Sequence, residues 1–501
     1  MAERHLFTSR IGFVLAAAAS AVGLGNLWRF PYLAAEYGGG IFLLIYLVLV
    51  LTLGFTIMVT EIAVGRKTGK SALWAFRDLN KKWHFLGILA LLVPCIILPY
   101  YSVIGGWIME YAALFMSNLG GMAADGGAFF SAFISGNFAP IIWTVIFMVI
   151  TAFVLLFGVK DGIQRVCTVI MPLLIVLMIG LSVYCICQPG GLDGLAYYFI
   201  PDFSKFSGEA VLAAMGQMFY SLSLAMGIMI TYGSYLHKKE NIEKSVRTIE
   251  IFDTGVAFLA GLMIVPAVFM FSGGSPEALG AGPGLMFINL PQVFNTMPFG
   301  EVIGAVFFIC VFFAALTSAI SLFEVPVSAL IDKFKMKRVK AVGIVLLGEL
   351  IVGVIVNLGY GVWADFTIFG FQILDFMDTL SNNIMMPILA LLTCIFIGWV
   401  VKKKTKIVTD EVEGIDEADK AKEVVHIAAD SPGLKAFAAA GSISEEELPA
   451  VAEAVNKYRD DHWEGTPKFR FKAKKFYVVM VKFIAPICIA AILVYMVYGL
   501  F

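Results

Sequence analysis

The sequence predicts an all-α protein that crosses a membrane eleven times. Of its 501 residues, 60% are hydrophobic and only 15% are charged, whereas soluble domains carry about 45–50% apolar and about 25% charged residues. Apolar stretches of about 20 residues, the length that spans a bilayer, recur along the chain. They cover residues 11–35, 41–63, 86–116, 140–158, 163–186, 210–236, 251–272, 301–332, 340–357, 373–401 and 476–499.

Positive charges in the loops predict the orientation. Lys and Arg are retained on the cytoplasmic side of a membrane, and up to Lys340 alternate loops hold nineteen of them, against Lys205 alone in the other loops. Residues 1–10 are therefore expected in the cytoplasm, and an odd number of spans places the C-terminus outside. Residues 402–475 then form a cytoplasmic loop ahead of the last span, within residues 476–501.

This loop is acidic in part and flanked by lysines. Its segment Ser444–Tyr458 has helical periodicity and a Ser-x-x-Glu start, which predicts a short surface helix. A solvated loop is the alternative, and nothing in the sequence supports a regulatory role.

The composition argues against several classes of protein. A net charge of −1 gives no support to bulk nucleic-acid binding. All seven cysteines lie in apolar stretches, where packing is their expected role. None of the five histidines lies in the middle of a span, and no nucleophile–base pair or metal cluster is apparent, so an enzyme is not expected.

Two expected spans contain interruptions. The first holds Gly23-Leu24-Gly25-Asn26, and the sixth holds Ser221–Gly227. Irregular backbone at membrane depth is tolerated only where it is buried in protein or lines a wet cavity. Its free carbonyls suit a cation and its half-helix N-termini suit an anionic group. The two interruptions occupy corresponding positions of two five-span halves, residues 11–186 and 210–401, as in an inverted-repeat transporter, although glycine pairs also serve close helix packing.

Polar groups expected at depth are candidate functional residues or members of structural ion pairs. The ionisable ones are Arg29, Glu36, Glu61, Glu110, Asp253, Glu324, Glu349, Asp375 and Asp378. The run Ala315-Leu316-Thr317-Ser318 adds hydroxyls of the kind that alkali cations prefer, unless these hydroxyls bond back to their own helix.

Six motifs follow one another along the chain. They are Ala21–Pro31 (AVGLGNLWRFP), Glu36 with Gly38–Gly40, Glu61 with Gly65-Arg66, Tyr100-Tyr101 with Trp107, Ser221–Leu224 leading to Ile230–Tyr235, and Ala315–Ser318. Together they resemble the neurotransmitter:sodium symporter family over residues 4 to about 401. The resemblance implies the leucine-transporter fold, an inverted five-plus-five repeat with discontinuous helices 1 and 6. Eleven spans are typical of several prokaryotic amino acid transporters of this family.

The resemblance also implies two sodium sites built from oxygen ligands, and no organic cofactor. The first site is made by Ala21, Asn26, Ser221 and Asp253, together with the carboxylate of the substrate. The second is made by the carbonyls of Ala19, Val22 and Ala314 and the hydroxyls of Thr317 and Ser318. Because the substrate is itself a ligand of the first ion, binding of each raises the affinity for the other.

The substrate is expected to be an amino acid. Family members that carry amines without a carboxylate have an aspartate where this chain has Ser20, so the substrate here brings its own carboxylate. By resemblance, that carboxylate meets Tyr101 and the backbone of Gly23 to Gly25. The amino group meets the carbonyls of Ala21 and Tyr220 near Ser223.

The expected side-chain pocket has no residue that is ionisable at neutral pH, which favours a neutral, mostly apolar amino acid. The resemblance assigns to it Ile97, Ile104, Tyr220, Met226, Ser318 and Leu322. Ala225 stands where many relatives have glycine, so it is expected to narrow the pocket or alter the unwinding of the sixth span. Bulky aromatic substrates are thereby disfavoured without being excluded.

The chloride site of the family is only partly matched. Tyr46, Gln217 and Ser221 agree with the chloride-dependent pattern, but the decisive position in the seventh span is Ala257 and Asp253 lies one turn earlier. A fixed carboxylate there offsets the charge of sodium, which predicts chloride independence.

Two gates follow from the same resemblance. Arg29 and Asp378 close the outer side through a direct or water-bridged pair, with Tyr101 and Tyr220 as a lid. Arg4 and Asp332 close the inner side, supported by Phe7, Ser234, Tyr235 and Glu324.

The sequence therefore predicts a sodium-coupled symporter that imports a neutral amino acid across the plasma membrane by alternating access. One alternative is a membrane sensor that binds an amino acid without moving it and uses residues 402–475 as its output. Another is a proton-coupled transporter on the same fold, with Glu61 or Asp253 as the proton carrier.

Overall fold

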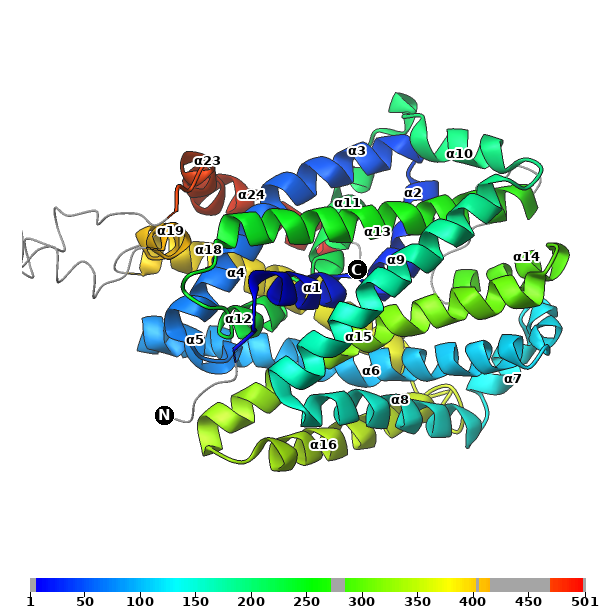
Figure 1. Cartoon of the computed structure of the whole chain (residues 1–501), viewed down its shortest axis with the longest axis horizontal. Coiled ribbons are helices and arrows are strands. Elements are labelled where there is room, and N and C mark those ends of the chain that lie inside the picture. Colours follow the sequence, from blue (N-terminus) through cyan, green and yellow to red (C-terminus); the bar gives the residue numbers. More distant parts are fainter. Residues whose placement is uncertain (1–5, 272–283, 402–404, 415–468, 499–501) are drawn as a thin grey trace, which may run out of the picture.

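The computed structural model describes residues 6–271, 284–401, 405–414 and 469–498 (Figure 1). Their regular secondary structure is helical, apart from two isolated β-bridges. The α-helices are α1 (Arg10–Ala21), α2 (Phe30–Glu36), α3 (Gly40–Leu49), α4 (Phe55–Thr68), α5 (Ala72–Leu79), α6 (His84–Met116), α7 (Ala128–Ile134), α8 (Ala139–Leu156), α9 (Arg165–Ile186), α10 (Gly191–Phe199), α11 (Gly208–Ser221), α12 (Ile228–Gly233), α13 (Ile242–Phe271), α14 (Leu290–Thr296), α15 (Gly300–Phe334), α16 (Arg338–Leu358), α17 (Ile373–Asp378), α18 (Met386–Ile395), α19 (Lys406–Glu413), α23 (Lys474–Val479) and α24 (Ala485–Tyr498). Short π-helical turns join several of them into longer spans.

Nine helices of the described residues are long and apolar enough to cross a membrane. A bent pair, Arg10–Ala21 with Gly25–Glu36, raises the number to ten if it is one span. The remaining expected span, residues 210–236, consists of α11 with 14 residues and α12 with 6, each too short to be counted alone. The chain is thus a multi-pass helical protein, and the count of eleven stays a prediction.

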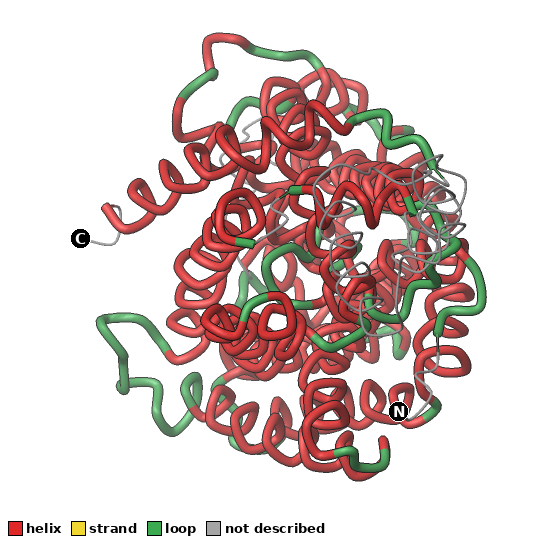
Figure 2. The backbone as a smooth tube through the Cα atoms, turned by 90° about the vertical axis from the view of Figure 1, so that its left-hand side faces the viewer, coloured by secondary structure: helices red, strands yellow, loops and turns green. Residues whose placement is uncertain are grey.

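The long helices run roughly side by side along one axis (Figure 1) and are seen nearly end-on in Figure 2. Helix α6 packs along α15, and α8 and α16 flank this pair, while α13 packs against α9, α1 and α2. The short helices α5, α19 and α23 lie at one end of the bundle, and α7, α10 and α14 lie at the other (Figure 1). The lysine- and arginine-rich segments that carry α5, α19 and α23 therefore share one end.

The chain breaks its helical path twice near the centre of the bundle. Helix α1 ends at Ala21, the backbone of Val22 is extended, and the π-helical turn η1 (Gly25–Arg29) starts a segment that is bent by 51°. Between α11 and α12, Ser223 and Ala225 have φ of 52° and 56°. This left-handed conformation costs L-residues other than glycine roughly 1–2 kcal/mol each. Both breaks lie within protein, where irregular backbone is tolerated.

Glycine allows α4 and α12 to touch. A Cβ atom on Gly65 would lie 1.9 Å from the carbonyl oxygen of Ile230, and one on Gly233 would lie 2.4 Å from that of Ile62. Small residues at such crossings let backbones approach closely in membranes. The glycine of the Gly65-Arg66 motif therefore has a packing reason in this structure.

A short helix, α19, lies near the start of residues 402–475, which were expected to form a cytoplasmic loop. Arg66 donates from Nε to Oε1 of Glu411 at 2.9 Å, and its Nη2 donates to the carbonyl of the same residue. Its Nη1 donates to the carbonyl of Glu240 at 2.5 Å. The two ends of the segment meet where the amide of Phe469 donates to the carbonyl of Glu413 at 3.0 Å. The expected helix Ser444–Tyr458 lies outside the described residues.

Candidate functional site

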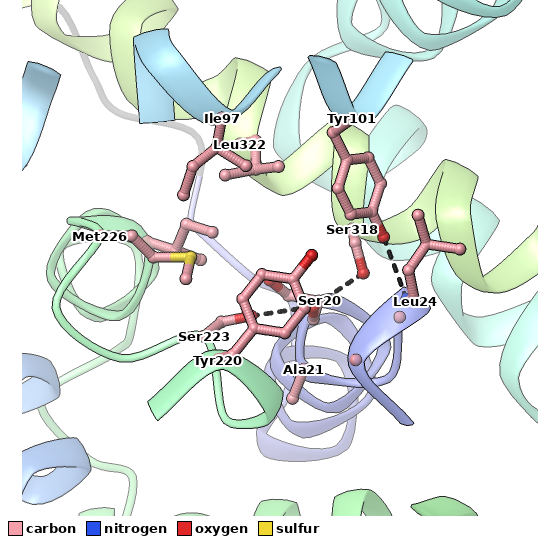
Figure 3. Close-up of a pocket in the computed structure, with 13 residues that line it drawn as sticks. Ser20, Ala21, Leu24, Ile97, Tyr101, Tyr220, Ser223, Met226, Ser318 and Leu322 are labelled. Carbon is pink, nitrogen blue, oxygen red and sulfur yellow. Dashed lines mark hydrogen bonds between the residues drawn. The ribbon is translucent and has the colours of Figure 1, made fainter. Parts of the chain in front are cut away.

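A cavity lies between the two chain breaks and the helices α6 and α15 (Figure 3). About 20 Å³ of it is open to the centre of a water molecule. Its walls are made by Ser20, Ala21, Gly23, Leu24, Gly25, Ile97, Tyr101, Tyr220, Ser223, Met226, Ile228, Ser318 and Leu322. Ile228 was not singled out in the sequence, and Leu24 only as part of the backbone of Gly23 to Gly25, whereas Ile104, Ser221 and Ala225 do not line this cavity.

One end of the cavity is polar. The carbonyl of Ser20 accepts hydrogen bonds from the hydroxyls of Ser223 at 3.0 Å and Ser318 at 2.9 Å. The hydroxyl of Tyr101 accepts from the amide of Leu24 at 3.3 Å. Ile97, Met226 and Leu322 lie on the other side in Figure 3, so the cavity offers a polar end and an apolar end.

A fully buried polar cluster lies next to this cavity. The amide nitrogen Nδ2 of Asn26 donates to Oδ1 of Asp253 at 2.8 Å, and the hydroxyl of Ser221 donates to the same carboxylate at 2.9 Å. The hydroxyl of Tyr46 donates to Oδ2 of Asp253 at 3.2 Å. Asn26, Ser221 and Asp253 are each 0% exposed. Every group that contacts this carboxylate is a neutral donor, so the cluster can accommodate a cation.

The residues expected around a second ion are brought together where α1 meets α15. Ala19, Val22, Ala314 and Thr317 are completely buried. The hydroxyl of Ser318 also donates to the carbonyl of Val22 at 3.2 Å. The hydroxyl of Thr317 bonds back to its own helix, at 3.1 Å from the carbonyl of Ala314, which is the alternative that the sequence left open.

The remaining members of the chloride pattern lie around the same carboxylate. Tyr46 and Ser221 both donate to Asp253, and Nε2 of Gln217 donates to the carbonyl of Gly25 at 2.8 Å. Ala257 is buried and supplies no polar side-chain group. Tyr46 and Ser221 thus converge on the carboxylate of Asp253, whereas Gln217 bonds to the backbone of the first chain break.

On the expected outer side, Arg29 and Asp378 do not form a direct ion pair within the described residues. The guanidinium of Arg29 lies 5.7 Å from the ring centre of Tyr220, and Oδ1 of Asp378 accepts from Asn382 at 2.7 Å. Arg29 therefore lies above the tyrosine that lines the cavity.

On the expected inner side, Phe7 and Tyr235 pack against each other. Phe7 is 1% exposed, packs edge-on against Tyr235, and donates its amide to the carbonyl of Tyr235 at 3.1 Å. The hydroxyl of Tyr235 donates to Glu324 at 2.7 Å, and Glu324 pairs with Arg338, a partner that the sequence did not suggest.

Of the expected inner pair, Arg4 and Asp332, the structure describes only Asp332. Arg4 lies outside the described residues, and Oδ2 of Asp332 accepts from the amide of Ser71 at 2.8 Å.

Glu61 reaches the second chain break. Its Oε1 accepts from the amide of Ala225 at 2.8 Å, and its side chain is 2% exposed. The carboxyl group thereby satisfies a backbone donor that the broken helix leaves without a helical partner.

Comparison with known proteins places this architecture in one family. The model of the sodium:neurotransmitter symporter family matches residues 4–121 and 135–418. A sodium-dependent transporter of Haemophilus influenzae, itself uncharacterized, is 35% identical over 419 residues, which is 81% of this chain and 91% of the relative. The uncharacterized sodium-dependent transporter YhdH of Bacillus subtilis is 38% identical over 401 residues, or 79% of this chain and 88% of the relative.

A solved structure shares the fold. The crystal structure of MhsT in complex with L-phenylalanine superposes with a TM-score of 0.79 at 33% identity, over 99% of this chain and 100% of that chain. The chain therefore belongs to the sodium:neurotransmitter symporter family. It is a multi-pass membrane transport protein and not an enzyme.

Proposed function

We propose that this chain is a sodium-coupled symporter that imports a neutral, mostly apolar amino acid across the plasma membrane by alternating access. The observation that carries the proposal is the buried cluster of Asn26, Ser221 and Asp253 beside a cavity with one polar and one apolar end. An amino acid likewise has charged amino and carboxylate groups at one end and a side chain at the other. The likeness to MhsT, whose structure was solved with L-phenylalanine, supports an amino acid as the substrate.

The polar end suits the charged groups of an amino acid. The amides at the break from Gly23 to Gly25, together with the hydroxyl of Tyr101, would bind the carboxylate. The carbonyls of Ala21 and Tyr220 and the region of Ser223 would bind the amino group. These groups approach from both broken helices, so substrate binding would draw the two breaks together.

The apolar end of the cavity determines which substrate side chains fit. Ile97, Met226, Ile228 and Leu322 line it, and none of them is charged. Ala225 does not line this cavity, so its methyl group does not narrow the space for the substrate side chain. We therefore include large apolar and aromatic amino acids among the proposed substrates.

Sodium would be held at the two positions that the resemblance implies. Ala21, Asn26, Ser221 and Asp253 would hold the first ion, and the contacts of Asp253 with neutral donors alone fit a cation there. Ala19, Val22, Ala314, Thr317 and Ser318 would hold the second. The ion supplies positive charge to the substrate carboxylate in a site of low dielectric, where such an attraction is strong.

Chloride is not required in this proposal. Asp253 carries the negative charge that offsets sodium, and the tyrosine and serine of the family's chloride pattern are already bonded to it. Replacing chloride with gluconate should leave sodium-driven uptake unchanged, and loss of uptake would show that Asp253 does not take the place of the anion.

Transport would alternate between the two gates. The inner side is closed by Phe7 against Tyr235, and Arg29 lies over Tyr220 on the outer side. With the N-terminus in the cytoplasm and the C-terminus outside, the sodium gradient would drive import. Opening of the inner side requires that Phe7 leave its buried site.

Counterflow of labelled substrate into proteoliposomes tests the proposal. A purified symporter exchanges internal unlabelled amino acid for external label when sodium is present, whereas a sensor binds without exchange. A panel of amino acids is first ranked by thermal stabilisation in sodium and in potassium, because a ligand of the native state raises stability by mass action. Equal stabilisation in both salts would contradict sodium coupling, and exchange driven by a proton gradient alone would favour the proton-coupled alternative.

A further inference from the structure

A second cavity, with three polar residues in an otherwise apolar lining, lies away from the substrate site, among α6, α8, α15 and α16. The polar side chains that line it are Ser102, Thr151 and Glu349, and its other walls include Leu98, Met148 and Phe323. About 10 Å³ of it is open to the centre of a water molecule, which is room for about one water. The four helices lie together in the lower half of Figure 1.

Glu349 is the unexplained group in this cavity. Its side chain is only 7% exposed in a membrane-spanning helix, and its Oε2 has no hydrogen-bond partner within the described residues. The hydroxyl of Ser102 is fully buried and equally without a partner there. Buried polar groups are almost always satisfied, so two unsatisfied groups facing one cavity point to a ligand.

The available hydrogen bonds decide which form of the carboxyl group fits. The hydroxyl of Thr151 already donates to the carbonyl of Phe147 at 2.9 Å, so its oxygen can only accept. An ionised Glu349 would find Ser102 as its one side-chain donor. A protonated Glu349 is itself a donor, and it would find two acceptor oxygens, those of Ser102 and Thr151.

Among the residues that the structure describes, no positively charged side chain lines the cavity. The titratable group near Glu349 on α6 is the thiol of Cys95. On α15 the neighbouring carboxylate, Glu324, is engaged by Arg338 and Tyr235, and α8 contributes only Met148 and Thr151. A hard metal cation would need about six oxygen ligands, more than these side chains supply in a space for one water.

We propose that Glu349, Ser102 and Thr151 form a proton-binding site within the helical scaffold, separate from the substrate and sodium sites. The carboxylate takes up one proton, and the new O–H donates to Ser102, to Thr151 or to a single bound water. An uncharged carboxyl group also removes the cost of an unpaired charge at membrane depth.

The proposed proton site and the substrate cavity are lined by neighbouring residues of the same two helices, α6 and α15. Leu98 and Ser102 on α6 each follow directly after a residue that lines the substrate cavity, and on α15 Phe323 follows Leu322. A change at either cavity therefore acts on the same turns of α6 and α15. This adjacency gives protonation of Glu349 a short physical route to substrate binding.

Infrared difference spectroscopy of the full chain in lipid tests the proposal. At neutral pH the protein should show the C=O stretching band of a buried carboxylic acid, which Glu349→Gln removes and the matched Glu110→Gln on α6 keeps. Ser102→Ala should keep the band but shift it to higher frequency, because a hydrogen bond to the acid is lost. Identical spectra of Glu349→Gln and the unmodified protein would overturn the proposal. The proposal would also be overturned if Glu349→Gln lost its sodium-dependent thermal stabilisation and kept the infrared band. The site would then hold sodium.

Discussion

Replacement of Asp253 by asparagine is the sharpest test of the first sodium site. The substitution preserves the shape of the side chain but removes a negative charge that is 0% exposed. It also puts an NH₂ group among donors, because Asn26, Ser221 and Tyr46 donate to this carboxylate at 2.8, 2.9 and 3.2 Å. Both effects weaken a site that holds a cation.

The size of the loss follows from the charge. Two unit charges about 4 Å apart attract by ~4 kcal/mol at an effective dielectric constant of about 20. Since each 1.4 kcal/mol is a tenfold change in Kd, sodium affinity should fall by roughly a thousandfold. The sodium dependence of substrate binding, measured by scintillation proximity on purified protein, should shift accordingly.

Glu250→Gln is the matched control on the same helix, one turn earlier. Glu250 is 1% exposed and pairs with Arg247 at 3.2 Å, away from the proposed ion. Its substitution also neutralises a buried carboxylate, so it should lower thermal stability while leaving the sodium dependence in place. A sodium dependence of Asp253→Asn within about threefold of that of the unmodified protein, a difference below 1 kcal/mol, would refute the assignment of this carboxylate.

Four further substitutions test other contacts. Gly23→Ala should abolish substrate binding in the same assay without unfolding the protein, because the new Cβ would lie 2.9 Å from the hydroxyl of Tyr101. Ala225→Gly should raise thermal stability by about 1 kcal/mol, since φ of 56° is strained for alanine; an unchanged or lower melting temperature would contradict this. Glu411→Gln breaks a buried ion pair and should cost about 3–5 kcal/mol, whereas Asp78→Asn breaks an exposed pair and should cost less than about 1 kcal/mol in the same unfolding assay.

The helical spans were largely predictable because the signal for them is local. The stretch expected at 301–332 is α15, Gly300–Phe334, and the one expected at 340–357 is α16, Arg338–Leu358. The breaks in the first and sixth spans coincide with the glycine- and serine-rich interruptions. Apolar length and backbone irregularity are properties of a few consecutive residues, so the sequence displays them directly.

Contacts between distant segments were not predictable in the same way. Helix α19 lies in the expected cytoplasmic loop and is tied to α4 because Arg66 pairs with Glu411, 345 positions away. The pairing of Glu324 with Arg338 depends likewise on how α15 and α16 meet. Ile104 has the helical spacing of Ile97 and Tyr101, but the cavity ends at Tyr101, whose hydroxyl accepts from the amide of Leu24.

The buried carboxyl groups of this protein differ most in what surrounds them. Glu324 faces the guanidinium of Arg338, which makes it a member of a structural ion pair. Asp253 faces three neutral donors, an arrangement that favours the ionised form and leaves its charge for a cation. Glu349 shares its cavity with hydroxyl oxygens and, within the described part of the chain, with no cationic side chain, an arrangement that favours the acid form. The sequence placed all three at membrane depth, and their different hydrogen-bond partners support the proposals that Asp253 holds sodium and Glu349 holds a proton, while Glu324 belongs to an ion pair.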